Sequence, residues 1–257
     1  MNRMKVAAIQ IGPEHASKEM LETLVATSVD GGARLLCFPE HWIGNETERG
    51  VSTVIELMKN LARDFRVTII AGGFYLDFQE GPYVAAPVID LQGEVIGVQR
   101  KIHLFGEEKK IAKPGSDITI FNIDGVRLGV IICYDLAFPE VARALALKGV
   151  DLVFVPSRIL SHGVKPWHLY LSTRCLENRL PMVSANIVWP PQYIGQSIIL
   201  GLEEHIDSSI VYPKIIGIGG QSSEAIVAEI DLETARRLRE SRLSERRPEV
   251  YKSMLNG

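Results

Sequence analysis

Three polar side chains, each at the end of a predicted strand, are the residues of this chain best suited to do chemistry. Cys133 directly follows the apolar, β-branched run 126–132, which is long enough for a buried strand and too short for a buried helix. Glu40 comes just after a second predicted strand, and Lys101 follows a third. A thiol, a carboxylate and an ammonium group at strand ends could meet in one crevice. Their spacing does not show that they do, because Glu40 also suits a turn and Lys101 also suits a solvated surface.

The segment after Cys133 is predicted to be a helix over residues 138–148. Pro139 is tolerated in its first turn, and Gly149 is a common helix stop. Residues 151–155 then form the next buried strand. This unit would put the sulfur at the carboxyl edge of a sheet, facing the positive end of a helix, where a thiolate forms most easily. The alternative is a small core residue without chemistry.

The remaining elements must bring these three residues together. Helical spacing predicts helices at 17–29, capped by Ser17, from Ser52 to about residue 65, at 167–179 and at 232–240. Apolar or alternating runs predict strands at 5–10, 34–38, 68–75, 83–90, 94–99, 118–123, 126–132, 151–155, 182–186, 196–200, 209–211 and 225–230, with a polar loop at 100–115. Helices and strands interleave, yet tight turns at Gln92-Gly93 and Asp124-Gly125 join strand pairs. The pattern predicts mixed sheets with helices outside.

Length, charge and cysteine usage exclude several classes of protein. The chain has 257 residues and a formal net charge of −3, and we expect one domain over 1–257 because no linker interrupts it. This charge gives no reason to expect nucleic acid or a membrane as a partner. No signal peptide is apparent. The three cysteines form no CxxC pair, which argues against a disulfide scaffold and a zinc site. We therefore expect a cytoplasmic location.

Three segments, in order, resemble the nitrilase superfamily of carbon–nitrogen hydrolases, and the resemblance extends over nearly the whole chain. LCFPE at 36–40 is similar to the segment that carries the family's catalytic glutamate. RKIHLF at 100–105, followed by Pro114-Gly115, is similar to its lysine segment, and ICYD at 132–135, followed by FPE, to its nucleophile segment. LENR at 176–179 and Ala185-Asn186 match two further positions. The resemblance implies an α/β fold, a four-layer αββα sandwich with two mixed β-sheets, and a triad of Glu40, Lys101 and Cys133.

The resemblance also implies a second glutamate seven residues beyond the lysine. That position is Glu108, and a slip of one residue would exchange it for Glu107. Cys133 is expected to attack an amide carbonyl carbon, with Glu40 as general base. Lys101 and the backbone N–H of Tyr134 are expected to hold the oxyanion.

In this scheme water then hydrolyses the thioester, and Glu108 orients the amide and Glu40. The chemistry needs no metal and no organic cofactor. His103, inside the lysine segment, is interpreted as a hydrogen-bonded support.

Candidate substrate-binding residues lie near these segments. Arg158 follows the strand after Cys133, in a region that lines the substrate pocket of the resembling family, and an arginine there could hold a carboxylate with two hydrogen bonds. The alternative is a structural ion pair. Trp42, Phe105 and Trp167 are candidate pocket aromatics, although aromatic residues are more often in the core.

The implied function is hydrolysis of a small non-peptide amide to a carboxylic acid and ammonia or an amine. Hydrolysis of a nitrile or of an N-carbamoyl amide stays open, as does a catalytically idle binding or scaffold protein. Against the last, buried charges are costly without a function. A papain-like Cys–His pair lacks the local sequence around Cys133. Similar proteins form homodimers, so we expect residues 241–257 at a subunit contact.

Overall fold

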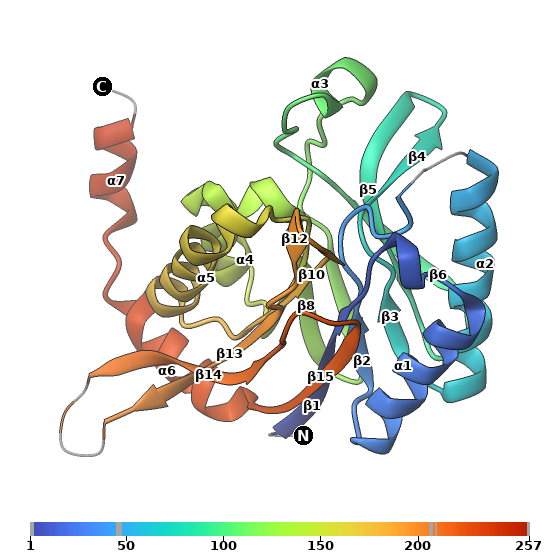
Figure 1. Ribbon diagram of the computed structural model, residues 1–257. Helices are drawn as coiled ribbons and strands as arrows, with labels where there is room; N and C mark the ends of the chain where they lie inside the picture. The colour runs from blue at the N-terminus through green and yellow to red at the C-terminus, as the bar shows by residue number, and fades with distance from the viewer. Residues whose placement is uncertain (1–2, 45–47, 206–207, 209, 256–257) are drawn as a thin grey trace.

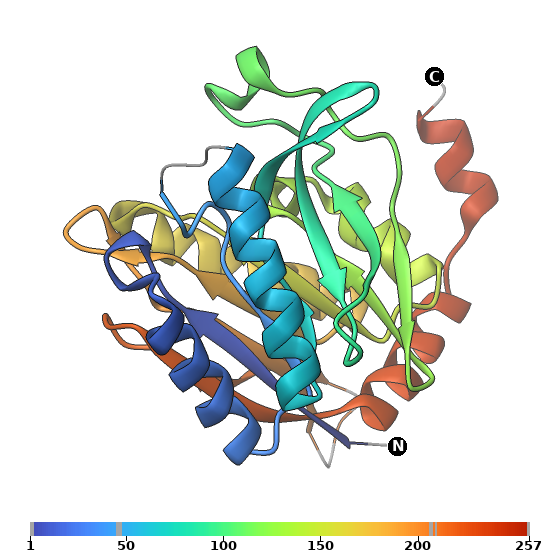
Figure 2. The same ribbon diagram turned by 90° about the vertical axis from the view of Figure 1, so that its right-hand side faces the viewer.

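The computed structural model describes residues 3–44, 48–205, 208 and 210–255. Its centre is a pair of mixed β-sheets packed face to face, with helices on the outer side of each sheet (Figures 1 and 2). The prediction of an αββα sandwich is therefore confirmed.

The first sheet has seven strands and carries the segment before Glu40. Its order is β15-β1-β2-β3-β5-β4, and β6 also pairs with β5. Its strands are β1 (Arg3–Gln10), β2 (Leu35–Cys37), β3 (Thr68–Ile70), β4 (Phe74–Phe78), β5 (Gly81–Ile89), β6 (Val95–Arg100) and β15 (Glu224–Asp231). Strands β1, β2 and β3 are parallel, whereas the other pairs are antiparallel.

The second sheet has six strands and carries the segment before Cys133. Its order is β14-β13-β10-β9-β8-β7, and β8, β9 and β10 are parallel. Its strands are β7 (Ile120–Ile123), β8 (Val126–Val130), β9 (Leu152–Ser157), β10 (Met182–Asn186), β13 (Ile198–Glu204) and β14 (Val211–Ile218). A separate hairpin consists of β11 (Val188–Trp189) and β12 (Tyr193–Ile194).

Three apolar layers hold the sandwich together. Between the sheets, inward side chains such as Val6, Leu35 and Phe154 form one core. Helices α1 (Lys18–Asp30) and α2 (Glu48–Phe65) pack on the outer face of the first sheet. Helices α4 (Pro139–Leu147) and α5 (Val164–Asn178) cover the second sheet in the same way. Burial on both faces explains why the central strands are nearly continuous apolar runs.

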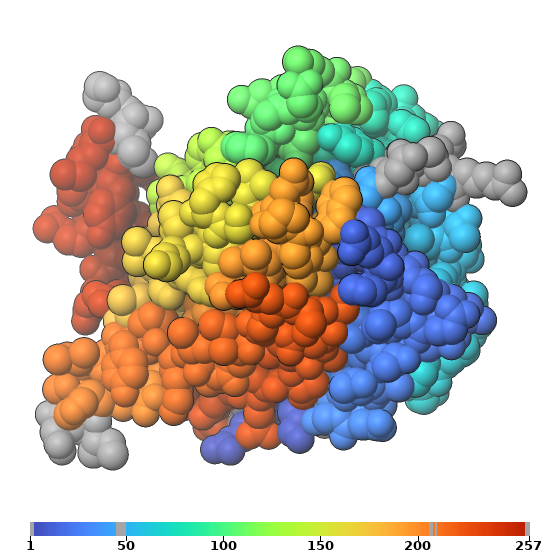
Figure 3. All heavy atoms as spheres, viewed as in Figure 1, coloured from blue at the N-terminus to red at the C-terminus, as the bar shows by residue number. Residues whose placement is uncertain are grey.

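The C-terminal segment forms α6 (Leu232–Ser244) and α7 (Pro248–Leu255), and α7 stands out from the body of the molecule (Figures 1 and 3). Positions 256–257 of the expected contact tail lie outside the described residues. None of the helices in the described part of the chain has both the length and the hydrophobicity needed to cross a bilayer.

Several predicted boundaries are confirmed and others are wrong. The Ser17 hydroxyl accepts from the Met20 N–H and caps α1, as expected. Ser52 is not a cap, because α2 already begins at Glu48. The predicted strand 68–75 is broken at Gly72, whose φ is +100° and against which the Pro39 carbonyl packs. The polar loop 100–115 contains the short helix α3 (Glu108–Ile111). Of the predicted strand 209–211, Ser209 lies outside the described residues and β14 begins at Val211.

Candidate active site

The strand ends that precede Glu40, Lys101 and Cys133 open onto one cavity of 860 Å³. Glu40 follows β2, Lys101 directly follows β6, and Cys133 follows β8. The Glu40 N–H donates to the Ser157 carbonyl at the end of β9, which joins the two sheets at this edge. Residues far apart in sequence thus meet where the sheets face each other.

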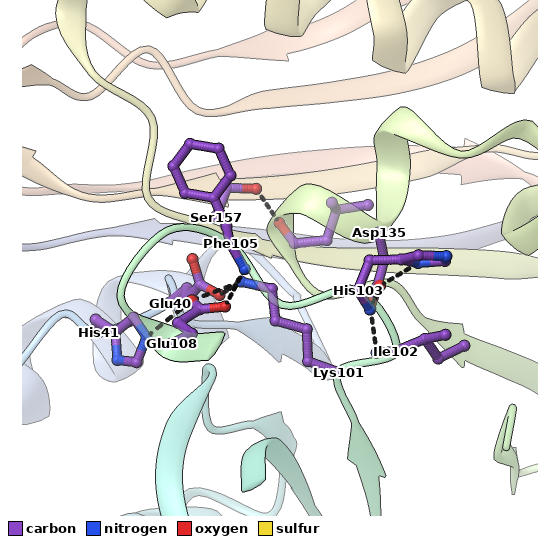
Figure 4. A network of polar contacts seen from close by, with 10 residues as sticks. Glu40, His41, Lys101, Ile102, His103, Phe105, Glu108, Asp135 and Ser157 are labelled. Atoms are coloured by element: carbon purple, nitrogen blue, oxygen red, sulfur yellow. Dashed lines mark hydrogen bonds and ion pairs between the residues drawn. The ribbon is translucent and has the colours of Figure 1, made fainter. Parts of the chain in front are cut away.

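Lys101 is the centre of the charged cluster. Its side chain is fully buried, and its Nζ donates to Glu40 Oε1 at 2.8 Å and to Glu108 Oε1 at 2.7 Å (Figure 4). Burial would lower the pKa of Lys101, but the negative charges of Glu40 and Glu108 raise it well above its usual value. The site therefore holds a permanent ammonium ion between two carboxylates.

Glu108, and not Glu107, is the glutamate that contacts Lys101. Glu108 is buried at the start of α3, while the Glu107 side chain is exposed and pairs with Lys110. Glu108 Oε1 also lies 3.6 Å from His41 Nε2, and Oε2 accepts from the Phe105 N–H. Burial would raise the pKa of Glu108, but the His41 hydrogen bond and the charge of Lys101 lower it to about 2.

Cys133 begins a 3₁₀ turn, Cys133–Ala137, with the unusual φ of +43°. A non-glycine residue in this region costs about 1–3 kcal/mol, and such strain collects at functional sites. The thiol shares a hydrogen bond with the Glu40 carboxylate, and the Arg158 N–H donates to the sulfur. Tyr134 lines the cavity in the first turn, where backbone N–H groups have no partner within the helix.

The expectation that this position makes the thiolate easy to form is wrong for the resting site. Burial raises the pKa of Cys133 well above its usual value, the negative charge of Glu40 raises it further, and Lys101 only partly opposes this. The resting thiol is therefore protonated, and a base must remove its proton when it reacts.

Asp135 links the nucleophile turn to the lysine segment, a role that the sequence did not assign. Its buried carboxylate accepts from the backbone N–H groups of Ile102 and His103, at 3.1 and 2.6 Å (Figure 4). The His103 ring contacts the same carboxylate through Nδ1 at 2.9 Å and stacks on Phe138 at 3.6 Å. His103 is thus a hydrogen-bonded support, as predicted. The available signal for Asp135 was its place directly after Cys133-Tyr134.

His41 is the second residue that the sequence left without a role at this site. It follows Glu40, adopts a φ of +51° and packs 5.0 Å from the Tyr75 ring. The only feature of the sequence that could have indicated this role was the position of His41 directly after Glu40.

The candidate pocket aromatics divide into two groups. Phe105 and Trp167 line the cavity, and Trp167 Nε1 donates to Ser184 Oγ at 3.2 Å. Trp42 does not line it, so that prediction is wrong. Trp42 is fully buried between Phe38 and Phe74, and its Nε1 donates to the Ala71 carbonyl. Its indole packs in the core between the first sheet and its helices.

Glu40, His41 and Glu108 have ligand atoms within 4.8 Å of one another, close enough to hold a metal ion. The Lys101 ammonium already contacts both carboxylates there and supplies the positive charge that such an ion would bring. The arrangement is suited to nucleophilic attack by sulfur beside a base and a cationic oxyanion donor.

The chain is similar to known proteins over most of its length. The family model described as carbon-nitrogen hydrolase matches residues 5–240. A probable nitrilase of Schizosaccharomyces pombe is 34% identical over 216 residues, covering 80% of this chain and 76% of its own. A nitrilase of Pyrococcus abyssi is 30% identical over 276 residues, covering 96% and 99%. An N-carbamoylputrescine amidase of Solanum lycopersicum is 29% identical over 234 residues, covering 80% and 74%.

Among solved structures, a carbon-nitrogen hydrolase from Helicobacter pylori G27 superposes with a TM-score of 0.85. It is 21% identical, and the match covers 100% of this chain and 99% of that one. At this sequence identity, the similarity shows a shared fold and nothing further.

Proposed function

Because this chain belongs to the carbon–nitrogen hydrolase family of the nitrilase superfamily, we propose that it hydrolyses a small non-peptide amide through a thioester on Cys133. The observation that carries the proposal is the ion cluster of Lys101 with Glu40 and Glu108, at 2.8 and 2.7 Å, in the cavity that Cys133 lines. Buried charges of this kind are costly, and catalysis gives them a use.

In the first half-reaction, Glu40 accepts the thiol proton while Cys133 Sγ attacks the amide carbonyl carbon. The carbonyl oxygen becomes an oxyanion, held by the Lys101 ammonium and the Tyr134 N–H. When the C–N bond breaks, Glu40 returns the proton to the nitrogen, which leaves as ammonia or an amine. Proton transfer by a placed base is typically worth about 10²–10⁴ in rate. The hydrogen bond between Glu40 and the thiol supports this role.

In the second half-reaction, Glu40 takes a proton from water, and the resulting hydroxide attacks the thioester carbonyl. The tetrahedral adduct expels the thiolate, which recovers its proton from Glu40, and the carboxylic acid leaves. Glu108 acts as a positioning residue in this scheme, because its oxygens hold Lys101, His41 and the Phe105 N–H. One lone pair of Oε2 stays available to the substrate amide.

Nitrile hydrolysis is the second candidate, favoured by two relatives that are named nitrilases. The same sulfur would add to the nitrile carbon, and water would replace nitrogen through a thioimidate to give the acid and ammonia. An N-carbamoyl amide, as in the name of the tomato relative, would be cleaved by the amide route.

The test is ammonia or amine release from short amides, ω-amides, N-carbamoyl compounds and nitriles. We expect turnover of amides, and Cys133→Ala should lower it by several orders of magnitude. Intact-mass analysis during turnover should show the acyl adduct on Cys133. Cys175→Ala is the matched control, because Cys175 is a buried thiol outside the cavity.

The idle-scaffold alternative predicts a different pattern. If no compound is hydrolysed, and iodoacetamide labels Cys133 no faster than the fully buried Cys37 and Cys175, the proposal is wrong. Turnover of nitriles without turnover of amides would replace the leading candidate by the second.

A further inference from the structure

Arg158 lines the same cavity as Cys133 and has no acidic partner. It directly follows β9, and within the described part of the chain its guanidinium forms no ion pair, while its buried Nε lacks a hydrogen-bond partner. The alternative of a structural ion pair is therefore not what the fold provides. Arg158 as a whole is half-buried, but its buried Nε costs free energy unless an acceptor reaches it.

The guanidinium is held in place by the β11–β12 hairpin. Its central carbon lies 5.0 Å from the centroid of the Tyr193 ring on β12. The Ser161 N–H, three residues after Arg158, donates to the Gln192 carbonyl in the hairpin turn at 2.8 Å. The arginine is thus fixed against an aromatic face on one side, which leaves its remaining donors for a ligand.

The two cations that line the cavity differ in whether a carboxylate contacts them. Lys101 is paired with Glu40 and Glu108, and the third lining carboxylate, Glu107, pairs with the exposed Lys110 outside. Of the lysines and arginines that line the cavity in the described residues, only Arg158 lacks a carboxylate. Arg158 therefore offers a ligand a cation that no carboxylate in the described part of the chain contacts.

The position of Arg158 sets how far that charge lies from the reacting carbon. Its backbone N–H donates to the Cys133 sulfur, so its guanidinium lies within the length of one arginine side chain plus one hydrogen bond of the nucleophile. A guanidinium fork matches the two oxygens of a planar carboxylate. We propose that the substrate is an amide that bears a carboxylate a few carbon atoms from the scissile carbonyl, and that Arg158 binds this carboxylate. The inference rests on the proposed amide hydrolysis.

The test compares glutaramate with pentanamide, which has the same carbon chain without the carboxylate. We expect the wild type to prefer glutaramate in kcat/KM. Arg158→Gln should lower kcat/KM for glutaramate by roughly 10- to 100-fold, the range for charge-assisted hydrogen bonds, and change that for pentanamide less than about threefold. Arg158→Lys should fall between, because lysine keeps the charge but not the fork. Arg246→Gln is the matched control, since Arg246 also lies over a tyrosine ring but outside the cavity.

Calorimetric binding of both amides to Cys133→Ala separates this inference from the proposed function. We expect glutaramate to bind more tightly than pentanamide, and Cys133→Ala/Arg158→Gln to bind them equally. If the wild type hydrolyses both amides without preference, or Arg158→Gln affects both alike, the inference is wrong and the proposed function stands. If glutaramate binds selectively but no amide is turned over, the carboxylate site stands and the hydrolase proposal fails.

Discussion

Replacing Lys101 by methionine tests whether the Lys101 ammonium stabilises the two buried carboxylates of the cluster. The variant Lys101→Met keeps the length of the side chain but leaves Glu40 and Glu108 facing each other in a buried site without a cation. Removing one partner of a buried pair typically costs about 3–5 kcal/mol. We expect that loss in the free energy of unfolding at pH 8, and a fall in kcat of about 10²–10³ from the lost oxyanion donor.

The loss of unfolding free energy in Lys101→Met should depend on pH, and the direction of this dependence follows from the pKa values of the two carboxylates. In the wild type the pKa of Glu108 is lowered to about 2 from its usual 4.5, so its stabilisation is present above pH 4.5 and is lost as the pH falls toward 2. Without Lys101, burial and mutual repulsion should raise at least one carboxyl pKa above 4.5. The variant then regains stability as the pH falls, at about 1.4 kcal/mol for each unit of pKa change that the pH range covers.

Urea unfolding at pH 8 and pH 5.5 measures this difference directly. The gap between wild type and Lys101→Met should be smaller at pH 5.5, because the wild-type contribution of Glu108 is constant over that range. Lys110→Met is the matched control, since Lys110 pairs with Glu107 on the surface and should show little change at either pH. An equal cost at both pH values, or a cost no larger than that of Lys110→Met, would refute the reasoning.

Three further perturbations follow from the contacts around the site. Gly73→Ala would place a Cβ 3.2 Å from Glu40 Cγ, so kcat should fall about tenfold or more. Gly201→Ala is the control, because its Cβ would meet the nearest side chain at 3.5 Å and should have little effect on kcat. Equal kcat values for the two variants would contradict this prediction. Asp135→Asn should lower kcat by at least about tenfold, because one oxygen that accepts backbone N–H groups becomes an NH₂; wild-type kinetics would show that the link to Lys101 does not matter. Light scattering of the full-length chain should give a mass of twice 28.5 kDa, the mass of one chain. Deletion of residues 245–257, which carry the exposed Tyr251 and Met254, should give the monomer. A full-length chain that stays monomeric at micromolar concentration would contradict the predicted dimer.

Local sequence identified the candidate catalytic residues because strand ends, turns and helix caps are encoded by short sequence patterns. Cys133 after a β-branched run and Lys101 after an alternating one both lie at strand ends in the structure. The spacing could not decide between Glu107 and Glu108, since both begin the same turn. The tertiary structure separates them, because Glu108 points into the cavity and Glu107 toward solvent.

The misassigned features share one physical cause. Trp42 looked like a pocket aromatic, but the side of the loop on which its indole lies depends on packing between β-strands and helices. The helix that follows Cys133 suggested a lowered thiol pKa. The pKa instead responds to burial and to the charges of Glu40 and Lys101, which follow other strands.

The sequence patterns by themselves determined most of the strands and helices and the chemical groups at the strand ends, and the family resemblance implied the αββα class. The tertiary structure alone decided which of those groups touch, which charges pair, and that Arg158 lines the cavity without a carboxylate partner among the described residues. The reason is that hydrophobic periodicity acts over a few residues, whereas electrostatic pairing and desolvation act through space between segments that are distant in sequence.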